Sequence, residues 1–163
     1  MISSAIKWNN CALGRTEDSA RTTLLRFFRQ LDAKPLKTQN AKRPLTEGQA
    51  WTAFIGPLYV RDGGREWLNE ALDAAIAGRD GTGLQEINDW FIERNARGRY
   101  TNNSNTSIYA INCLDGFGAQ TLAQARRERA TVVKQLPILG QLFGWGDETC
   151  AKWPYRAQEP VRR

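Results

Sequence analysis

The stretch Trp67–Ile76, Trp-Leu-Asn-Glu-Ala-Leu-Asp-Ala-Ala-Ile, decides the fold class. Its apolar residues come in pairs, and successive pairs are four positions apart: Trp67, Leu68, Ala71, Leu72, Ala75 and Ile76. This spacing places all of them on one face of an α-helix. The turn sequence Asp62-Gly63-Gly64 precedes the stretch, and Gly78 follows it at the position expected for a C-terminal cap. The stretch therefore predicts an amphipathic helix with one buried face.

Helical signals also precede this stretch. Residues 18–33 carry apolar side chains at helical spacing, and Pro35 with the polar residues 37–43 after them predicts a loop. Thr46 is a candidate N-cap, and Gln49 stands three positions later as its capping-box partner. Pro57 is expected to bend or end the helix that Thr46 begins.

The second half of the chain continues in the same way. A helix is expected from Thr82 toward Gly98, and a long charged helix over residues 119–136 is stopped by Pro137. The apolar run Ser107–Leu114 predicts a short buried helix, with a strand as the alternative, because a short apolar run does not reveal its period. Residues 138–143 predict one more helical turn. No segment alternates apolar and polar residues over its length, so the sequence predicts an all-α fold of five to seven helices.

Composition limits the chemistry of this chain. It has 163 residues, 41% of them hydrophobic, which suits one domain with an ordinary core. It contains no histidine, so it cannot by itself build a Ser-His-Asp triad, a Cys-His pair or a histidine-ligated metal site. The net charge of +6 is spread along the chain and forms no basic stripe with interleaved aromatic residues. A solvated basic surface, without nucleic-acid binding, is therefore expected.

The three cysteines, Cys11, Cys113 and Cys150, are too far apart for a C-x-x-C motif. Two interpretations stay open: three buried thiols, or one disulfide and one remaining cysteine, which would indicate an oxidising compartment. No apolar run reaches the length of a membrane span, and residues 1–8 lack the pattern of a signal peptide. Taken alone, this predicts a cytoplasmic protein.

Motifs for catalysis are missing from the sequence. No serine stands in a G-x-S-x-G context, and the G-x-G pairs lack the third glycine of a phosphate-binding loop. Glu86, Asp89 and Glu93 have helical spacing, which favours a solvated helix face; a carboxylate pair for glycoside hydrolysis is the alternative. Asp115 follows an apolar run and precedes a glycine. It is either directed into a cleft or a residue of a helix-terminal turn.

Several short motifs follow one another in a definite order along the chain. The most specific pair is Ala110-Ile111-Asn112-Cys113-Leu114-Asp115 and, later, Cys150-Ala151-Lys152-Trp153-Pro154. Others precede them: Cys11-Ala-Leu-Gly, Leu31-Asp-Ala-Lys-Pro-Leu, Leu45-Thr-Glu-Gly and Ala77-Gly-Arg-Asp-Gly-Thr. In this order they resemble the lid segment of the secreted tripeptidyl-aminopeptidase-like serine peptidases of actinomycete type. These are α/β-hydrolase-fold exopeptidases related to proline iminopeptidase.

The resemblance implies that residues 1–154 form a helical lid domain, excised from an α/β-hydrolase, and that residues 155–163 form a linker-like tail leading toward the missing catalytic core. In that family the lid is inserted between two halves of the core, which carry the serine, aspartate and histidine of the triad. The resemblance therefore implies a secreted or cell-envelope parent protein. It also implies no catalytic residue, metal or cofactor in this chain alone.

The same resemblance implies roles for particular residues. The lid would cover the active site, gate the access of peptides and help bind the free N-terminus of the substrate. Asp115 is the candidate ligand of that ammonium group, with Asn112 and Tyr109 beside it. The family pattern further implies a disulfide between Cys113 and Cys150, which leaves Cys11 over or pairs it with a cysteine of the core.

The expected partners are the catalytic core of the parent protein and the N-terminus of a peptide substrate, with neither nucleic acid nor a membrane span. An exposed apolar underside would also favour self-association of the isolated chain. The alternative is a free-standing all-α module that docks a partner protein through an apolar face.

Overall fold

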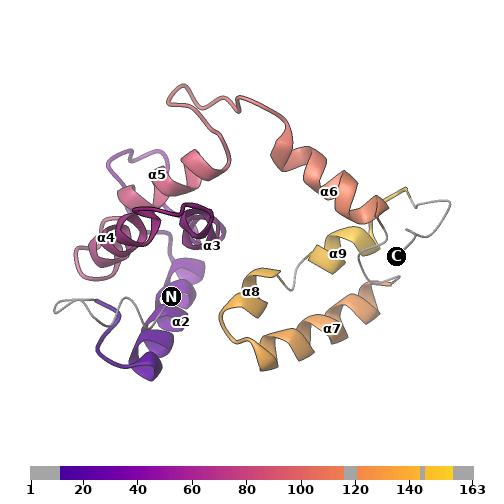
Figure 1. Ribbon diagram of the computed structural model, residues 1–163, viewed down its shortest axis with the longest axis horizontal. Helices are drawn as coiled ribbons and strands as arrows, with labels where there is room; N and C mark the ends of the chain where they lie inside the picture. Colours follow the sequence, from indigo (N-terminus) through magenta and orange to yellow (C-terminus); the bar gives the residue numbers. More distant parts are fainter. Residues whose placement is uncertain (1–11, 116–120, 144–145, 156–163) are drawn as a thin grey trace. The chain divides into compact units, whose positions relative to one another are not determined.

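The computed structural model describes residues 12–115, 121–143 and 146–155 (Figure 1). It confirms the all-α class: the described residues form helices, and their only β-pairings are two isolated bridges, Leu36 with Leu45 and Arg94 with Tyr100. The chain divides into two compact units, Met1–Thr101 and Asn102–Arg163. Cys11 and residues 156–163 of the predicted tail lie outside the described residues, and the predicted lid boundary at residue 154 stays a prediction.

The described part of the first unit consists of these helices: α2 (Glu17–Ala33), α3 (Glu47–Ile55), the 3₁₀ helix η1 (Gly56–Tyr59), α4 (Gly64–Ile76) and α5 (Thr82–Phe91). Helix α5 packs against α3 and α4, and α2 packs against α3 (Figure 1). The predicted amphipathic stretch is the greater part of α4, and it buries Leu68, Ala71, Leu72 and Ala75. Tertiary packing of apolar helix faces therefore holds this unit together.

Helix boundaries in this unit follow the signals in the sequence. Thr46 and Gln49 form the predicted capping box: the Thr46 N–H donates to Gln49 Oε1 at 2.9 Å, and the Gln49 N–H donates to Thr46 Oγ1 at 3.5 Å. Helix α3 ends at Ile55, and Pro57 lies in η1, where its fixed φ suits the first turn. The prediction that Pro57 ends the helix is confirmed.

The end of α4 differs in detail from the expectation for Gly78. The left-handed residue of this turn is Arg79, with φ of 59°, and Gly78 precedes it. The Asp80 N–H donates to the carbonyl of Ala74 at 3.1 Å and so closes the turn. Gly78 is needed for a different reason, because a Cβ there would lie 2.7 Å from the carbonyl oxygen of Ala74. A non-glycine residue in the left-handed region is uncommon and strained.

An aromatic cluster forms part of the core of the first unit. The rings of Phe28 and Trp51 stack with centroids 3.5 Å apart, and Phe54 stands nearly perpendicular to both. The Trp51 Nε1–H donates to Glu47 Oε1 at 3.1 Å, which satisfies the buried indole. The core of this unit also contains fully buried aliphatic side chains: Leu24, Leu45, Leu84 and Ile87.

The described part of the second unit contains α6 (Ser104–Leu114), α7 (Leu122–Gln135), α8 (Leu139–Phe143) and α9 (Gly146–Ala151). Helix α7 packs against α8 and α9, and α6 packs against α9. The short apolar run Ser107–Leu114 is helical, which excludes the strand alternative. The expectation that this helix is buried is wrong: only Cys113 is buried in it. Apolar composition alone does not reveal whether a partner covers a helix.

This second unit has a small core. Its buried residues in the described part of the chain are few and small: Cys113, Ala125, Gly140 and Cys150. Cys113 of α6 and Cys150 of α9 form a disulfide, as the resemblance implied, and it spans 37 residues. The chain-entropy model gives such a cross-link about 4 kcal/mol of stability. The disulfide is thus a main reason why α6 stays attached to α9.

None of the helices in the described ranges is both long and apolar enough to cross a membrane.

Candidate functional site

The residues predicted to bind an amino terminus all lie on α6. Tyr109 and Asn112 are exposed positions of the helix, and Asp115 is its C-cap residue, whose N–H donates to the carbonyl of Ile111 at 2.9 Å. They are three positions apart, so they fall within about 120° of the helix circumference. The structure therefore brings the three onto one side of α6. It leaves Asp115 exposed, so the alternative of a helix-terminal residue describes its position in this chain.

Two isoleucines lie on the same side of the helix: Ile108 between Asn112 and Asp115, and Ile111 next to Asp115. Ile108 is 47% exposed and Ile111 is 51% exposed. Together the five residues Ile108, Tyr109, Ile111, Asn112 and Asp115 cover about 160° of the helix at its usual pitch. They are called the α6 face below. It combines apolar surface, two neutral polar groups and one carboxylate, a composition that suits contact with a partner or ligand better than contact with water alone.

The disulfide fixes the side of the same helix that lies next to Tyr109, because Cys113 is one helical turn further along. Cys113 is 3% exposed and is bonded to Cys150. Asp115, only two positions further along the chain, is exposed. Because Asp115 also ends α6, it lies at the negative end of the helix dipole. A cation near this helix end would meet both the carboxylate and the last carbonyl groups of the helix.

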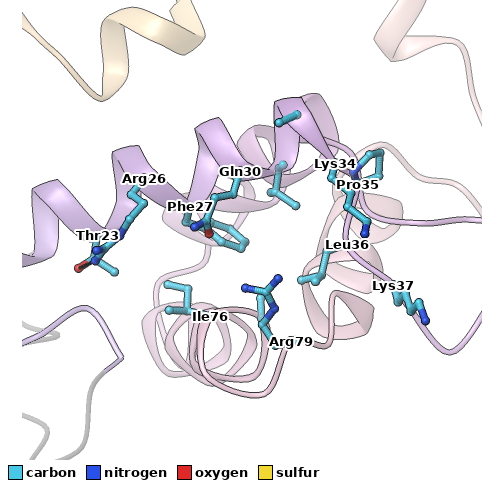
Figure 2. Close-up of a pocket in the computed structure, with 13 residues that line it drawn as sticks. Thr23, Arg26, Phe27, Gln30, Lys34, Pro35, Leu36, Lys37, Ile76 and Arg79 are labelled. Carbon is cyan, nitrogen blue, oxygen red and sulfur yellow. Dashed lines mark hydrogen bonds between the residues drawn. The ribbon is translucent and has the colours of Figure 1, made fainter.

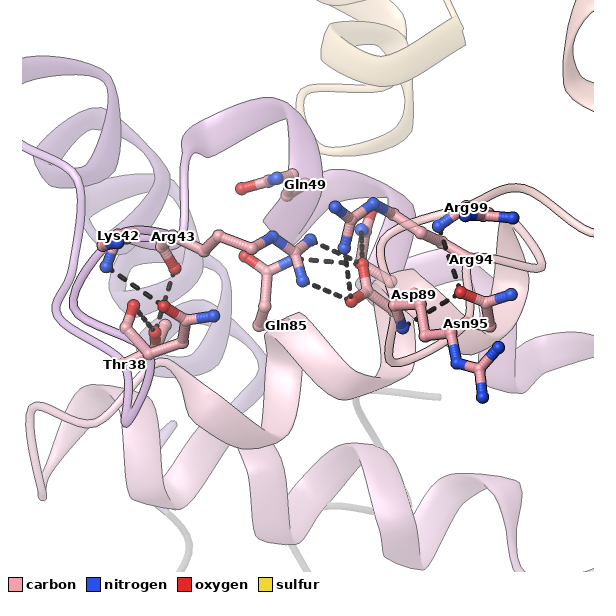
Figure 3. A network of polar contacts seen from close by, with 12 residues as sticks. Thr38, Lys42, Arg43, Gln49, Gln85, Asp89, Arg94, Asn95 and Arg99 are labelled. Atoms are coloured by element: carbon pink, nitrogen blue, oxygen red, sulfur yellow. Dashed lines mark hydrogen bonds and ion pairs between the residues drawn. The ribbon is translucent and has the colours of Figure 1, made fainter.

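The carboxylates Glu86, Asp89 and Glu93 do not form a pair, and the prediction of a shared solvated face is wrong for Asp89. Asp89 is partly buried and accepts two hydrogen bonds from Arg43, from Nη1 at 2.6 Å and from Nη2 at 2.8 Å. Figure 3 shows Asp89 between Arg43 and Arg94, whose Nη1 lies 3.6 Å from Asp89 Oδ2. Glu93 lies beyond the end of α5, where Thr101 Oγ1 contacts its carboxylate at 3.3 Å.

Two amides complete the surroundings of Asp89. The side chains of Gln85 and Asn88, both buried, donate to Asp89 Oδ1 at 3.3 and 3.2 Å. Partial burial raises the pKa of the Asp89 carboxyl, but the hydrogen bonds and charge of Arg43 more than offset this, so the pKa lies below its ordinary value. The hydrogen bond to Asp89 likewise raises the pKa of Arg43. This carboxylate is therefore ionised at neutral pH, and it ties the loop before α3 to α5.

Sequence reasoning missed this ion pair for a simple reason. Arg43 and Asp89 are 46 residues apart, and neither lies in a sequence motif that predicts contact with the other. The helical spacing of the carboxylates is present in the sequence. Arg43, which neutralises Asp89, comes close to it only because α3 packs against α5. Within the described residues, no group of three or more His, Cys, Asp or Glu side chains is arranged to hold a metal ion.

No protein-family model matches this chain, and no curated protein sequence matches it either.

Proposed function

We propose that this chain is the lid domain of a secreted α/β-hydrolase serine exopeptidase of the tripeptidyl- or prolyl-aminopeptidase type. In this role it covers the active site of the catalytic core, gates the access of peptides and helps bind the N-terminus of the substrate. The serine, aspartate and histidine of catalysis belong to the core. The observation that carries the proposal is the α6 face, where a carboxylate stands beside exposed apolar side chains at the end of a helix.

The apolar part of the α6 face supports a covering role. Ile108 and Ile111 are each about half exposed, while the same helix buries only Cys113. Apolar surface is stabilised by about 25 cal/mol for every Å² removed from water, so this face favours association with a further surface. A hydrolase core below the lid supplies such a surface in the proposal.

The polar part of the face supports recognition of an ammonium group. A peptide N-terminus carries three N–H donors and a positive charge. The Asp115 carboxylate, the Asn112 side-chain carbonyl and the Tyr109 hydroxyl can all accept hydrogen bonds. A bond from an ammonium to a carboxylate is about twice as strong as a neutral one. The negative end of the α6 dipole acts in the same direction.

The disulfide supports a secreted parent protein. Cross-links such as Cys113–Cys150 persist in oxidising compartments and are rare in the cytosol. The N-terminal residues alone predict a cytoplasmic location, which conflicts with this argument. We give the disulfide more weight, because it joins two helices that pack against each other in the second unit.

The first test is to determine the coding sequence upstream and downstream of this chain. We expect the coding sequence to continue upstream into a G-x-S-x-G motif, and downstream into an aspartate and then a histidine. A coding sequence that begins and ends with this chain would contradict the proposal. It would favour a free-standing protein-binding module that uses the same α6 face.

The second test uses the complete enzyme. The variant Asp115→Asn should raise KM for tripeptide substrates with a free amino terminus by about tenfold or more, because it removes one charge-assisted hydrogen bond. The values of kcat should change little. Asp62→Asn, in an exposed turn of the other unit, is the matched control. Equal effects of the two variants would contradict the role of Asp115.

A further inference from the structure

A pocket of about 700 Å³ lies in the first unit, between the second half of α2, the chain that follows it and the end of α4 (Figure 2). Its size falls in the usual range of small-molecule sites, about 300–1,000 Å³. None of the α6 residues discussed above lines it. The pocket lining therefore shares no residue with the site proposed for an amino terminus.

The charged groups around this pocket have one sign. Four cationic residues line it: Arg26, Lys34, Lys37 and Arg79. Among the described residues that line it, none is acidic. Figure 2 shows the Arg79 side chain extending from the end of α4 toward the α2 side chains Phe27 and Gln30. Four cations around one hollow repel one another and attract an anion.

The floor of the pocket is apolar. Phe27 and Leu31 of α2 and Ala75 of α4 are buried, and Ile76 stands beside them. An inorganic anion would use the cationic rim and make no contact with this floor. A neutral apolar compound would use the floor and leave the cations without a partner. An anion with an apolar body uses both.

The backbone conformation of Arg79 is a second observation that indicates a ligand site. Arg79 adopts a left-handed conformation, with φ of 59°, at a position where glycine or asparagine would be less strained. Backbone strain of this kind collects at ligand sites, where the side chain is needed for a task other than stability. At this position the side chain places a guanidinium group at the mouth of the pocket, where it can bind a carboxylate with two parallel hydrogen bonds.

We propose that the pocket between α2 and α4 binds a small organic carboxylate with an apolar body. The carboxylate contacts Arg79, with Arg26 and Lys34 adding to the positive potential, and the apolar body lies on Phe27, Leu31 and Ile76. Such a ligand has two sources with the same chemistry: a medium-chain fatty acid, or the C-terminal residue of a short peptide whose last side chain is apolar.

Binding to the full chain is measured by isothermal titration calorimetry with two pairs of compounds. Decanoate is compared with decan-1-ol, and N-acetylphenylalanine with its amide. Within at least one pair the carboxylate should bind about tenfold more tightly than its neutral partner, and this preference should weaken as salt is raised. The pair that shows the preference identifies the source. Equal binding of acid and neutral partner in both pairs, or no binding in either, overturns the proposal.

Variants assign the carboxylate to Arg79. Arg79→Asn removes the charge but keeps a residue that tolerates the left-handed conformation, and it should weaken carboxylate binding by about tenfold. Arg29→Gln is the matched control, because Arg29 is an exposed arginine on the same helix α2 whose Nε donates to the Leu25 carbonyl and which does not line the pocket. Circular dichroism shows whether Arg79→Asn folds. If it does not, Lys34→Gln replaces it as the test variant, and it too should weaken carboxylate binding. Losses equal to that of Arg29→Gln overturn the proposal.

Discussion

Arg43 holds the carboxylate of Asp89 with both of its terminal nitrogens, at 2.6 and 2.8 Å, across 46 residues of sequence. This two-point contact joins the loop between α2 and α3 to helix α5. The loop is also paired to itself through Leu36 and Leu45, whose backbone groups exchange hydrogen bonds at 2.9 and 2.8 Å. A long connection is thereby fixed without regular secondary structure.

Asp89→Asn should lower the free energy of unfolding by about 1–3 kcal/mol at neutral pH, because it leaves the partly buried Arg43 without its counter-ion. Glu86→Gln, an exposed change on the same helix, should have an effect within about 0.5 kcal/mol. Urea unfolding followed by circular dichroism measures both. Equal stabilities of the two variants would contradict a structural role for the pair.

The same pair predicts a dependence of stability on pH. The pKa of Asp89 is lower in the folded chain than its ordinary value of 3.8. Its contribution is therefore fully present above the unfolded pKa and disappears as the pH falls through the folded pKa. The difference between the original chain and Asp89→Asn should thus be large at pH 6 and shrink below pH 4. A difference that stays constant over this range would show that the charge of Asp89 is not the cause.

Loss of the disulfide should affect the second unit alone. Cys150→Ser removes the cross-link between α6 and α9 and should cost that unit about 4 kcal/mol, because its core is small. The helices of the first unit should keep their stability. Hydrogen exchange resolves the two units. Titration of thiols in denaturant without reductant gives an independent check, and three reactive thiols per chain would contradict the disulfide.

The α6 face should cause the isolated chain to self-associate at high concentration. Replacing Ile111, which is 51% exposed, by serine should reduce association without lowering stability. Tyr59→Ser, at a 77% exposed position of the first unit, is the comparison variant. Sedimentation velocity over a range of concentrations measures the effect. A monomer at all concentrations, or equal effects of the two variants, would count against this role of the face.

Arg79→Gly should make the chain more stable while it weakens the proposed carboxylate site. Glycine adopts a φ of 59° without strain, and relief of a left-handed residue contributes about 1 kcal/mol. Thermal unfolding should show a higher Tm for this variant. A lower Tm would mean that the Arg79 side chain stabilises the fold, and the strain would then need no ligand to explain it.

The pattern of apolar residues predicted most of the helices. The periodic residues of α4, the capping pair Thr46 and Gln49 and the stop at Pro57 are local signals, because each acts within one or two turns of helix. The helix predicted over residues 119–136 corresponds to α7, which ends at Gln135 as the stop at Pro137 predicts, but its N-cap Thr121 was not predicted. Helix α9 was missed, because six residues are too few to show a period.

The candidate site was predictable only in part. The placement of Tyr109, Asn112 and Asp115 on one side of α6 follows from helical spacing, once the stretch is known to be a helix. Their exposure does not, because it depends on what packs against α6. The sequence does not predict the pocket lined by Arg26 and Arg79, because its lining residues come from separate segments that lie together only in the folded unit.

The sequence by itself determined the helical class, the main helix boundaries and the exclusion of histidine chemistry, because these depend on composition and on neighbours along the chain. Only the tertiary structure decided that Asp89 is neutralised by Arg43, that α6 is exposed and that four cations surround one apolar hollow. These features join residues that are far apart in sequence. The free energy that fixes them comes from packing and charge pairing in space, which a one-dimensional pattern does not contain.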